Sequence, residues 1–223
     1  MIAREGNSIR DSMLTAQQLR DAIWGPTYLV DQTGEILLVG LRHWNSHVGD
    51  APGQPDPRGL IGRNLFEFIS GGDVQALYRQ ILVRIREDPN HVWELDYRCD
   101  SPGMLRALRM TVSAVAGAET GGALFSSQIL REGQRPPLSI FEYDKSLASL
   151  QDPSAPLLVI CSMCHRVLTK PGHEHDAANW IEPEQYYRSG GSAHVTLSHG
   201  LCPVCYAAFM SEVGSSAPPS PGA

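Results

Sequence analysis

The sequence predicts an α+β fold, with one antiparallel β-sheet whose helices pack on one face, followed by a small metal-binding module. Two β-rich runs joined by a turn occupy residues 27–40. One long amphipathic helix is expected over residues 72–88, and three strand-like runs follow it within residues 91–130. Strands and helices segregated in this way are typical of an open antiparallel sheet covered by helices.

The first two strands are predicted to form a hairpin within TYLVDQTGEILLVG. Asp31 and Gly34 supply the turn chemistry between two runs rich in β-branched and apolar residues. A loop rich in proline, glycine and aspartate follows over residues 45–58, and GLIGRNLFEFIS, residues 59–70, is expected to be a short helical stretch.

The helix over residues 72–88 is the clearest periodic element. Its apolar side chains recur at three- and four-residue intervals and would form one buried face. Asp73 is the expected N-cap. The apolar residues of this face are Val74, Leu77, Tyr78, Ile81, Leu82 and Ile85.

Three strands are predicted after the helix. In HVWELDYRC, residues 91–99, apolar side chains alternate with charged ones, so that one face of the strand is expected to be buried and the other exposed to solvent. The same alternation continues in MLRALRMTVSAV, residues 104–115, and the third run is ALFSSQIL, residues 123–130. Cys99 falls on the apolar face of the first run and is expected to be a small buried hydrophobe.

Composition divides the chain into five segments. The shift towards proline, serine and aspartate after the last strand is typical of a linker, and the glycine- and proline-rich end is typical of disorder. The predicted segments are 1–26, with a short helix over 16–24 that Thr15 would cap; 27–131, the sheet domain; 132–156, the linker; 157–213, the cysteine-bearing module; and 214–223, the tail.

Charge and hydropathy argue against several function classes. The formal net charge is −6 at pH 7, which argues against a broad nucleic-acid or anionic-membrane surface. No uninterrupted apolar run approaches the roughly 18 residues of a membrane span, and charges occupy the place of a signal peptide's apolar core. We therefore expect the reducing cytosol, where paired cysteines more often hold a metal than form structural disulfides.

Two Cys-x-x-Cys pairs predict one metal site formed by Cys161, Cys164, Cys202 and Cys205. Two-residue spacing lets both thiolates of a pair reach one ion, and four thiolates suit Zn²⁺ best and iron second. YAAFMSEV after Cys205 is predicted to be a helix, so that the second pair lies at a helix start, as in a treble-clef or zinc-ribbon-like finger. With four protein ligands the site would be structural, without hydrolytic catalysis. Two separate thiol pairs or one redox dithiol are the alternatives.

Other candidate ligands are histidines. His199 lies three residues before Cys202 and is interpreted as a neighbour of the site, with replacement of a cysteine as the alternative. His173 and His175 lie in a polar loop that is expected to be solvated, although a second metal site there is the alternative. His43 and His47 flank Trp44 and are interpreted as loop histidines.

Residues 20–210 resemble a known family. The hairpin YLVDQTGEILLVG, the turn GLIGRNLFEFI, the long helix and the three closing strands resemble a PAS domain, the small α+β sensor fold of signalling proteins. ICSMCHRV, Trp180 and SHGLCPVC resemble the cysteine module that follows the sensor-like domain in a group of small bacterial PAS proteins. The resemblance implies a five-stranded antiparallel sheet that senses a signal or dimerises.

The predicted function is that of a cytosolic signalling or adaptor protein. Its structural zinc module would bind a protein partner, and a homodimer is an open possibility. The alternative is a haem, flavin or thiol-redox sensor, with His43 or His47 as the haem ligand or with the cysteine cluster as the detector. A nucleic-acid-binding finger is the third hypothesis. No enzyme is predicted, because the sequence contains no P-loop, no G-x-S-x-G and no dinucleotide-binding glycine motif.

Overall fold

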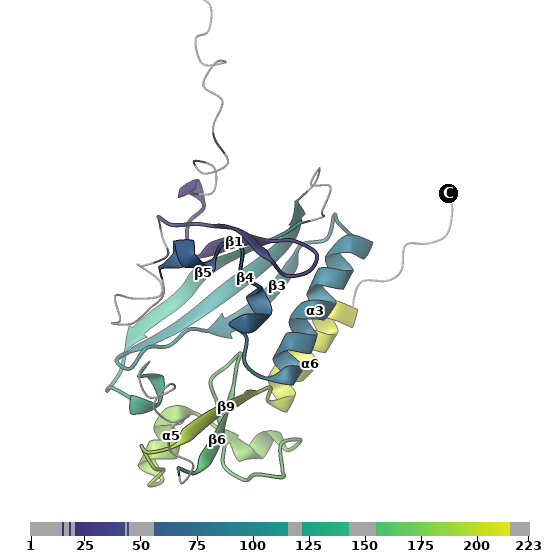
Figure 1. Ribbon diagram of the computed structural model, residues 1–223. Helices are drawn as coiled ribbons and strands as arrows, with labels where there is room; N and C mark the ends of the chain where they lie inside the picture. Colours follow the sequence, from purple (N-terminus) through teal and green to yellow (C-terminus); the bar gives the residue numbers. More distant parts are fainter. Residues whose placement is uncertain are drawn as a thin grey trace, which may run out of the picture.

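The computed structural model describes Thr15, Gln18, residues 21–42, Trp44 and residues 56–115, 122–142 and 155–214. The first sheet has five antiparallel strands in the order β2-β1-β5-β4-β3 (Figure 1). Its strands are β1 (Thr27–Val30), β2 (Ile36–Val39), β3 (Trp93–Arg98), β4 (Met104–Val115) and β5 (Gly122–Gln134). The predicted α+β class with a PAS-like five-stranded antiparallel sheet is confirmed.

The β1–β2 hairpin forms as its turn chemistry predicts. Asp31 Oδ1 accepts hydrogen bonds from the N–H groups of Thr33 and Glu35, both at 2.8 Å. Gly34 has φ +89°, and a Cβ there would lie 2.8 Å from the ring of Phe66. The turn therefore needs glycine both for its backbone conformation and for the close approach of that ring.

The expected helical stretch over residues 59–70 consists of two short 3-10 helices. These are η2 (Pro57–Leu60) and η3 (Leu65–Glu67), which are separated by a turn in which Gly62 has φ +83°. Asn64 caps η3 by accepting the N–H of Phe66 at 3.0 Å. The predicted helix over residues 16–24 lies partly outside the described residues, but Thr15 Oγ1 accepts the N–H of Gln18 at 3.2 Å, as an N-cap does.

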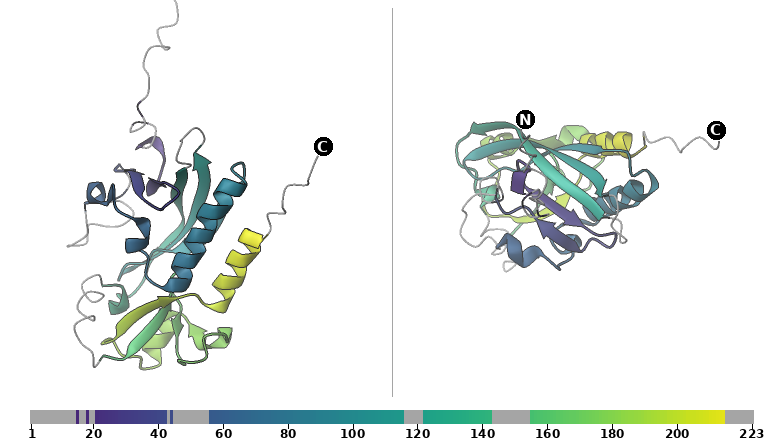
Figure 2. Two further views of the ribbon diagram at one scale, coloured as in Figure 1. Left: turned by 45° about the vertical axis from the view of Figure 1, so that its right-hand side comes forward. Right: turned by 90° about the horizontal axis from the view of Figure 1, so that it is seen from above.

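The long helix α3 (Gly72–Glu87) lies across one face of the sheet (Figure 2). The predicted apolar face is buried at Val74, Leu77, Ile81, Leu82 and Ile85. The predicted cap was wrong: the N-cap is Gly71, which has φ +91° and makes no side-chain cap hydrogen bond, while Asp73 lies inside the first turn. A Cβ on Gly71 would lie 2.7 Å from the carbonyl oxygen of His199, so the close contact with the second module selects glycine here.

The second sheet has four strands in the order β8-β7-β6-β9. The strand β6 (Leu157–Cys161) pairs in parallel with β9 (Thr196–Gly200), which forms one edge of the sheet. On the other side of β6 lie β7 (Val167–Leu168) and β8 (Trp180–Ile181). The helices of this module are α5 (Pro183–Arg188) and α6 (Pro203–Gly214), with the short turns η4 (Ser139–Phe141) and η6 (Ala177–Asn179) beside them. Among the described residues no helix is both long and apolar enough to cross a membrane.

The two sheets share one hydrophobic core at their junction. Trp93 and Leu95 of β3 belong to the same buried cluster as Met163, Phe209 and the buried cysteines Cys161 and Cys202. Leu138 and Ile140, in the predicted linker, are buried in a second cluster beneath β6 and β9. The first part of the segment 132–156 is therefore built into the fold, whereas residues 143–154 lie outside the described ones and the segment bounds remain a prediction.

Candidate metal centre

The first cysteine pair lies on the tight turn that follows β6. Cys161 is the last residue of that strand, and its carbonyl accepts the N–H of His165 at 2.9 Å, which closes the turn around Cys164. His165 has φ +61°, the one non-glycine residue in the described part of the chain with a positive φ. Histidine enters the left-handed region more readily than most non-glycine residues, and here this conformation ends the tight turn that carries the first cysteine pair.

The second cysteine pair lies at the start of α6. Cys202 immediately precedes Pro203, the first residue of the helix, and Cys205 lies in the first turn. The N–H of Cys202 points to Cys161 Sγ at 3.4 Å, and the N–H of Cys205 points to Cys202 Sγ at 3.4 Å. Because a helix N-terminus carries partial positive charge, this position favours thiolates over thiols.

The four sulfur atoms converge on one point. Each of the four lies within 4.8 Å of the others, and Cys164 Sγ and Cys202 Sγ are 3.7 Å apart. Four sulfurs at about 2.3 Å from a tetrahedral zinc ion would be about 3.8 Å from one another, so the donor set fits such an ion. All four cysteines are free, and among the described residues no other group of three or more histidine, cysteine or acidic side chains is gathered in this way.

The sulfurs strongly influence one another's ionisation. Hydrogen bonds from the thiols of Cys164, Cys202 and Cys205 lower the pKa of Cys161 well below its ordinary value. The hydrogen bond with Cys161 raises the pKa of Cys202, but the hydrogen bonds from Cys164 and Cys205 outweigh it and bring that pKa to about 7. The hydrogen bond with Cys161 in turn raises the pKa of Cys164 and of Cys205 above the ordinary value. Without an ion, thiolate character therefore lies at Cys161 and Cys202, and a bound metal would require the other two thiols to lose their protons as well.

The other sequence candidates lie apart from the four sulfurs. Cys99 is half-buried directly after β3. His173 and His175 are exposed, as expected for a solvated loop. His199 lies on β9 and lines a separate cavity. His43 and His47 lie outside the described residues, so the haem-ligand hypothesis remains untested.

A buried ion network lies next to the cysteine turn, and the sequence did not predict it. The side chain of Asp100 is fully buried and binds the guanidinium groups of Arg98 and Arg135, the latter at 3.2 Å. Its other oxygen accepts the N–H of Arg106 at 3.0 Å, and His165 Nδ1 lies 3.2 Å from the carboxylate. Burial raises the pKa of Asp100, but the hydrogen bonds from His165, Arg106 and Arg98 outweigh burial and hold that pKa far below its ordinary value.

Arg98 connects this network to the cysteine turn directly. Its backbone N–H donates to the carbonyl of Met163 at 2.7 Å, and its Nη1 donates to the carbonyl of Cys164 at 3.1 Å. The same guanidinium pairs with Glu182 at 2.6 Å. The end of β3 is therefore hydrogen-bonded to the turn that carries the first two thiols.

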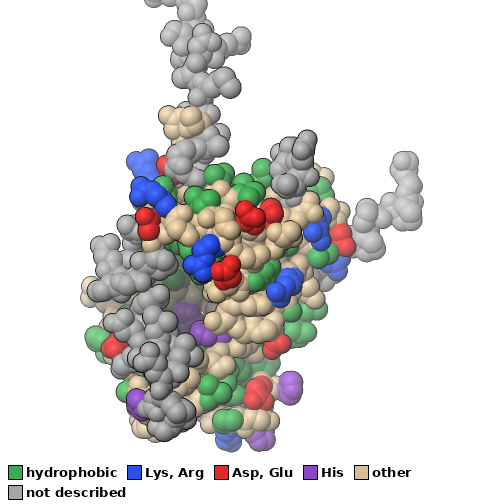
Figure 3. All heavy atoms as spheres, viewed as in Figure 1, with side chains coloured by type: hydrophobic (Ala, Val, Ile, Leu, Met, Phe, Trp, Pro, Cys, Tyr) green, Lys and Arg blue, Asp and Glu red, His purple; other side chains and the backbone are tan. Residues whose placement is uncertain are grey.

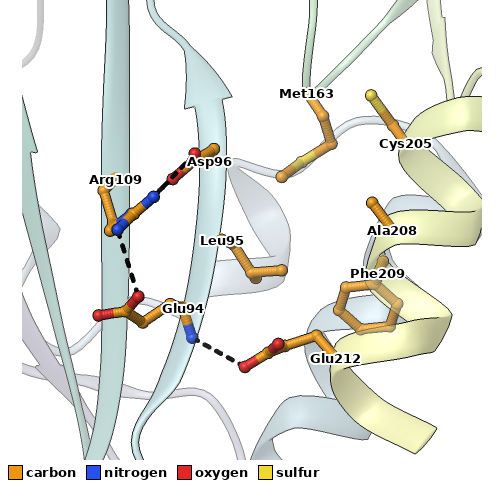
Figure 4. Close-up of a pocket in the computed structure, with 9 residues that line it drawn as sticks. All are labelled: Glu94, Leu95, Asp96, Arg109, Met163, Cys205, Ala208, Phe209 and Glu212. Carbon is orange, nitrogen blue, oxygen red and sulfur yellow. Dashed lines mark hydrogen bonds and ion pairs between the residues drawn. The ribbon is translucent and has the colours of Figure 1, made fainter. Parts of the chain in front are cut away.

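The helix α6 lies along the free edge of β3, which is the last strand of the five-stranded sheet (Figure 4). Between them is a groove of about 330 Å³ with Leu95, Met163 and Phe209 among its lining residues. Glu212 of α6 accepts the N–H of Glu94 at 3.4 Å. Because exposed edge strands pair readily with other chains, this arrangement protects the edge from unwanted pairing.

Comparisons with known proteins give the following. No protein-family model matches the sequence, and no curated protein matches it. Among solved structures, a PAS domain from a two-component sensor histidine kinase is 15% identical, with a TM-score of 0.34 over 51% of this chain and 92% of that one. The PAS domain of BvgS from Bordetella pertussis is 14% identical, with a TM-score of 0.38 over 61% of this chain and 91% of that one. The VqmA dimer from Vibrio cholerae is 18% identical, with a TM-score of 0.38 over 53% of this chain and 52% of that one.

Proposed function

We propose that this chain is a signalling protein in which one structural zinc ion, bound by Cys161, Cys164, Cys202 and Cys205, fixes a partner-binding module to a PAS-like sensing domain. The convergence of the four sulfurs carries this proposal. Four thiolates leave no open coordination position for water or substrate, so the ion would stabilise the fold and would perform no hydrolysis. The protein is proposed to act by binding, without an enzymatic activity of its own.

The position of the metal site supports a coupling role. The ligands come from the turn after β6 and from the start of α6, and both elements contact the sheet domain. Binding energies of structural zinc sites are on the order of 10 kcal/mol. An ion here would therefore hold α6 against the edge of β3 and would keep the two sheets in one arrangement.

A redox dithiol is the competing interpretation of the cysteines. A dithiol enzyme uses one Cys-x-x-Cys pair, whereas here the sulfurs of the two pairs approach one another as closely as 3.7 Å, between Cys164 and Cys202. This short distance between sulfur atoms of different cysteine pairs supports one ion shared by both pairs. Mild peroxide separates the two interpretations, because a structural site releases zinc on oxidation whereas a redox dithiol forms a disulfide without any metal release.

The module is proposed to bind protein rather than nucleic acid. Arg166 pairs with Glu182 at 2.9 Å, which leaves the module without a cluster of free cations for phosphates among its described residues. The helix α6 instead carries exposed apolar side chains one turn apart, with Tyr206 53% and Met210 39% exposed. Apolar side chains gathered on an exposed helix support a protein partner or a second copy of the chain.

Metal analysis tests the proposal directly. Protein purified without chelators is expected to contain one zinc per chain, and replacement by Co²⁺ is expected to give the absorption of a tetrahedral thiolate site. If the bound metal is iron, the identity of the ion would be corrected but the four-cysteine site would stand. Absence of any stoichiometric transition metal would refute the proposed function.

The oligomeric state tests the nature of the partner. If the partner is a second copy, light scattering of the zinc-loaded chain is expected to show a dimer that Tyr206→Glu dissociates. A monomer at every concentration would exclude the second copy and would leave another protein as the proposed partner.

A further inference from the structure

The helices α3 and α6 lie side by side and run in the same direction (Figure 2). Both begin beside β9, because Gly71 before α3 lies against the carbonyl oxygen of His199 and α6 starts shortly after that strand ends. We call the outward side of this pair the two-helix face. Its exposed residues are Ala76, Gln80 and Val83 of α3 and Tyr206 and Met210 of α6.

The helix α6 is apolar on nearly every side. Its one charged side chain, Glu212, reaches back to the edge of β3 and accepts the N–H of Glu94 at 3.4 Å. On the outward side, Tyr206 is 53% and Met210 is 39% exposed. A helix that is apolar all round is normally buried, so the outward side of α6 lacks a cover within the part of the chain that the structure describes.

The helix α3 extends this apolar area, with Val83 41% exposed. Between the two helices is a hollow of about 200 Å³, which is lined by the buried Leu77 and Phe209 and by the exposed Tyr206 and Met210. Figure 3 shows hydrophobic side chains at the surface over both helices. Large exposed side chains and a recess on one face suit a two-fold contact, because the same patch then supplies both parts of the contact.

The charges on this side of α3 are self-complementary. Asp73, Leu77, Gln80 and Arg84 follow at three- and four-residue steps, so they form one row along the helix. Asp73 is exposed and has no ion-pair partner among the described residues. Arg84 is 41% exposed and pairs with Glu87 at 3.0 Å, but a guanidinium group has donors for a second carboxylate. An antiparallel second copy would place Asp73 of each chain opposite Arg84 of the other.

One two-fold axis suits both helices. The halfway point of the row on α3 is level with the hollow, whose lining includes Tyr206 and Met210 of α6. An axis that crosses the helices at this level therefore also places Tyr206 of one chain opposite Met210 of the other, and methionine sulfur packs favourably against aromatic rings. An axis parallel to the helices would instead place Asp73 against the start of α6, where residues 201–206 include no cation.

We propose that a second copy of the chain covers the two-helix face, antiparallel about a two-fold axis that crosses α3 and α6, with contacts between Asp73 and Arg84 and between Tyr206 and Met210. The inference rests on the proposed function, because it identifies the second copy as the partner of the module.

The size of the face indicates how strong the association is. Two helices about 10 Å in diameter, the shorter about 18 Å long, give a footprint of about 360 Å² per chain. An interface of this size belongs to the small class that associates weakly and reversibly. The dissociation constant of the dimer is therefore expected to be about 1–100 µM.

Sedimentation of the zinc-loaded full chain between about 1 µM and 1 mM tests the proposal. Tyr206→Glu would bury two charges in an apolar contact, one from each chain, and is expected to raise the dissociation constant at least about tenfold. Leu130→Glu is the matched control, because Leu130 lies on β5 and is similarly exposed, at 51%. It is expected to leave the dissociation constant unchanged.

A charge exchange tests the antiparallel arrangement. Asp73→Lys and Arg84→Glu each place like charges opposite one another twice in a homodimer, and each is expected to weaken association about tenfold. An equimolar mixture of the two variants is expected to dimerise as tightly as the wild type, because both contacts in the mixed dimer again join opposite charges. Zinc content and melting temperature are measured for every variant to verify that it is folded.

Three outcomes would overturn the inference: a zinc-loaded chain that stays monomeric at about 1 mM, a dimer that Leu130→Glu weakens as much as Tyr206→Glu does, or a mixture that associates no better than its components. Each of these would leave the proposed metal site intact. A chain without stoichiometric metal refutes the proposed function instead, and the zinc measurement separates this failure from the other three.

Discussion

Asp100→Asn tests whether the buried ion network holds the two modules together. The side chain of Asp100 is 0% exposed, and the guanidinium groups of Arg98 and Arg135 that face it are 13% and 5% exposed. The substitution keeps the size of the side chain but removes its charge and turns an amide N–H group towards these donors. Two buried cations would then lack their shared anion.

The expected loss of stability follows from this geometry. Removing one partner of a buried ion pair typically costs about 3–5 kcal/mol, because the remaining charge stays desolvated. Arg98 keeps Glu182 and Arg135 keeps Glu184, but these carboxylates are 42% and 30% exposed and compensate only in part. For a protein of this size about 1 kcal/mol corresponds to roughly 2–4 °C, so the melting temperature is expected to fall by about 6–20 °C.

Thermal and urea unfolding of the zinc-loaded protein measure this loss. Asp96→Asn is the matched control, because Asp96 pairs with Arg109 on the surface, where both side chains are about half exposed, at 58% and 42%. An exposed pair contributes at most about 1 kcal/mol. If Asp100→Asn costs no more than Asp96→Asn, the network does not stabilise the junction and the reasoning is refuted.

Acid titration of the same pair of proteins checks the charge of Asp100. Its pKa in the folded state is depressed, so its contribution to stability is fully present above the ordinary carboxyl pKa of about 3.9 and is lost as pH falls towards the folded value. The difference in unfolding free energy between wild type and Asp100→Asn is therefore expected to be constant above about pH 5 and to shrink below pH 4. Loss of metal at acid pH affects both proteins and cancels in the difference.

Two further substitutions test the metal site and the junction. Cys202→Ser is expected to abolish stoichiometric zinc binding and to lower the melting temperature far more than Cys99→Ser does. The control substitution changes only a half-buried side chain and is expected to cost about 1 kcal/mol of stability. Equal melting temperatures for the two variants would contradict the metal site. Gly71→Ala is expected to destabilise the protein more than Gly190→Ala. Both glycines have positive φ, and alanine in that conformation costs about 1–2 kcal/mol at either position. Only at Gly71 would the new Cβ also lie 2.7 Å from a backbone atom, the carbonyl oxygen of His199. Similar unfolding free energies for the two alanine variants would show that α3 and β9 can separate without cost.

The sequence predicts the sheet and the long helix because both are half-buried. Trp93 and Leu95 of β3 are 1% and 7% exposed, and the intervening Glu94 faces solvent, so burial itself imposes the alternation seen in the sequence. The sequence also predicts the convergence of the four cysteines, the proposed metal ligands, because each pair lies on one tight turn and therefore has a fixed local spacing. Strand alternation and cysteine spacing can therefore be recognised in the sequence, because each depends on residues that are close together in the chain.

The ion network leaves no such pattern. Asp100 lies in the turn DSPG, where aspartate is usually a solvent-exposed turn residue, and its partner Arg135 lies within the predicted linker. Burial of this carboxylate depends on the cysteine module covering the turn, which is a contact between segments distant in sequence. For the same reason the cap of α3 was assigned to Asp73, because the close approach of β9 that selects Gly71 is a tertiary contact.

The cysteine turn is held from three directions. Its thiols face the second pair on α6, the N–H of Ser162 donates to the carbonyl of Gly200 on β9 at 2.9 Å, and His165 lies against Asp100. Because packed elements shift as discrete units rather than deform continuously, a displacement of this turn must also move the four cysteines, and α6 with them. Loss of the proposed metal ion would therefore act on the same helix whose exposed apolar side chains are proposed to bind the partner.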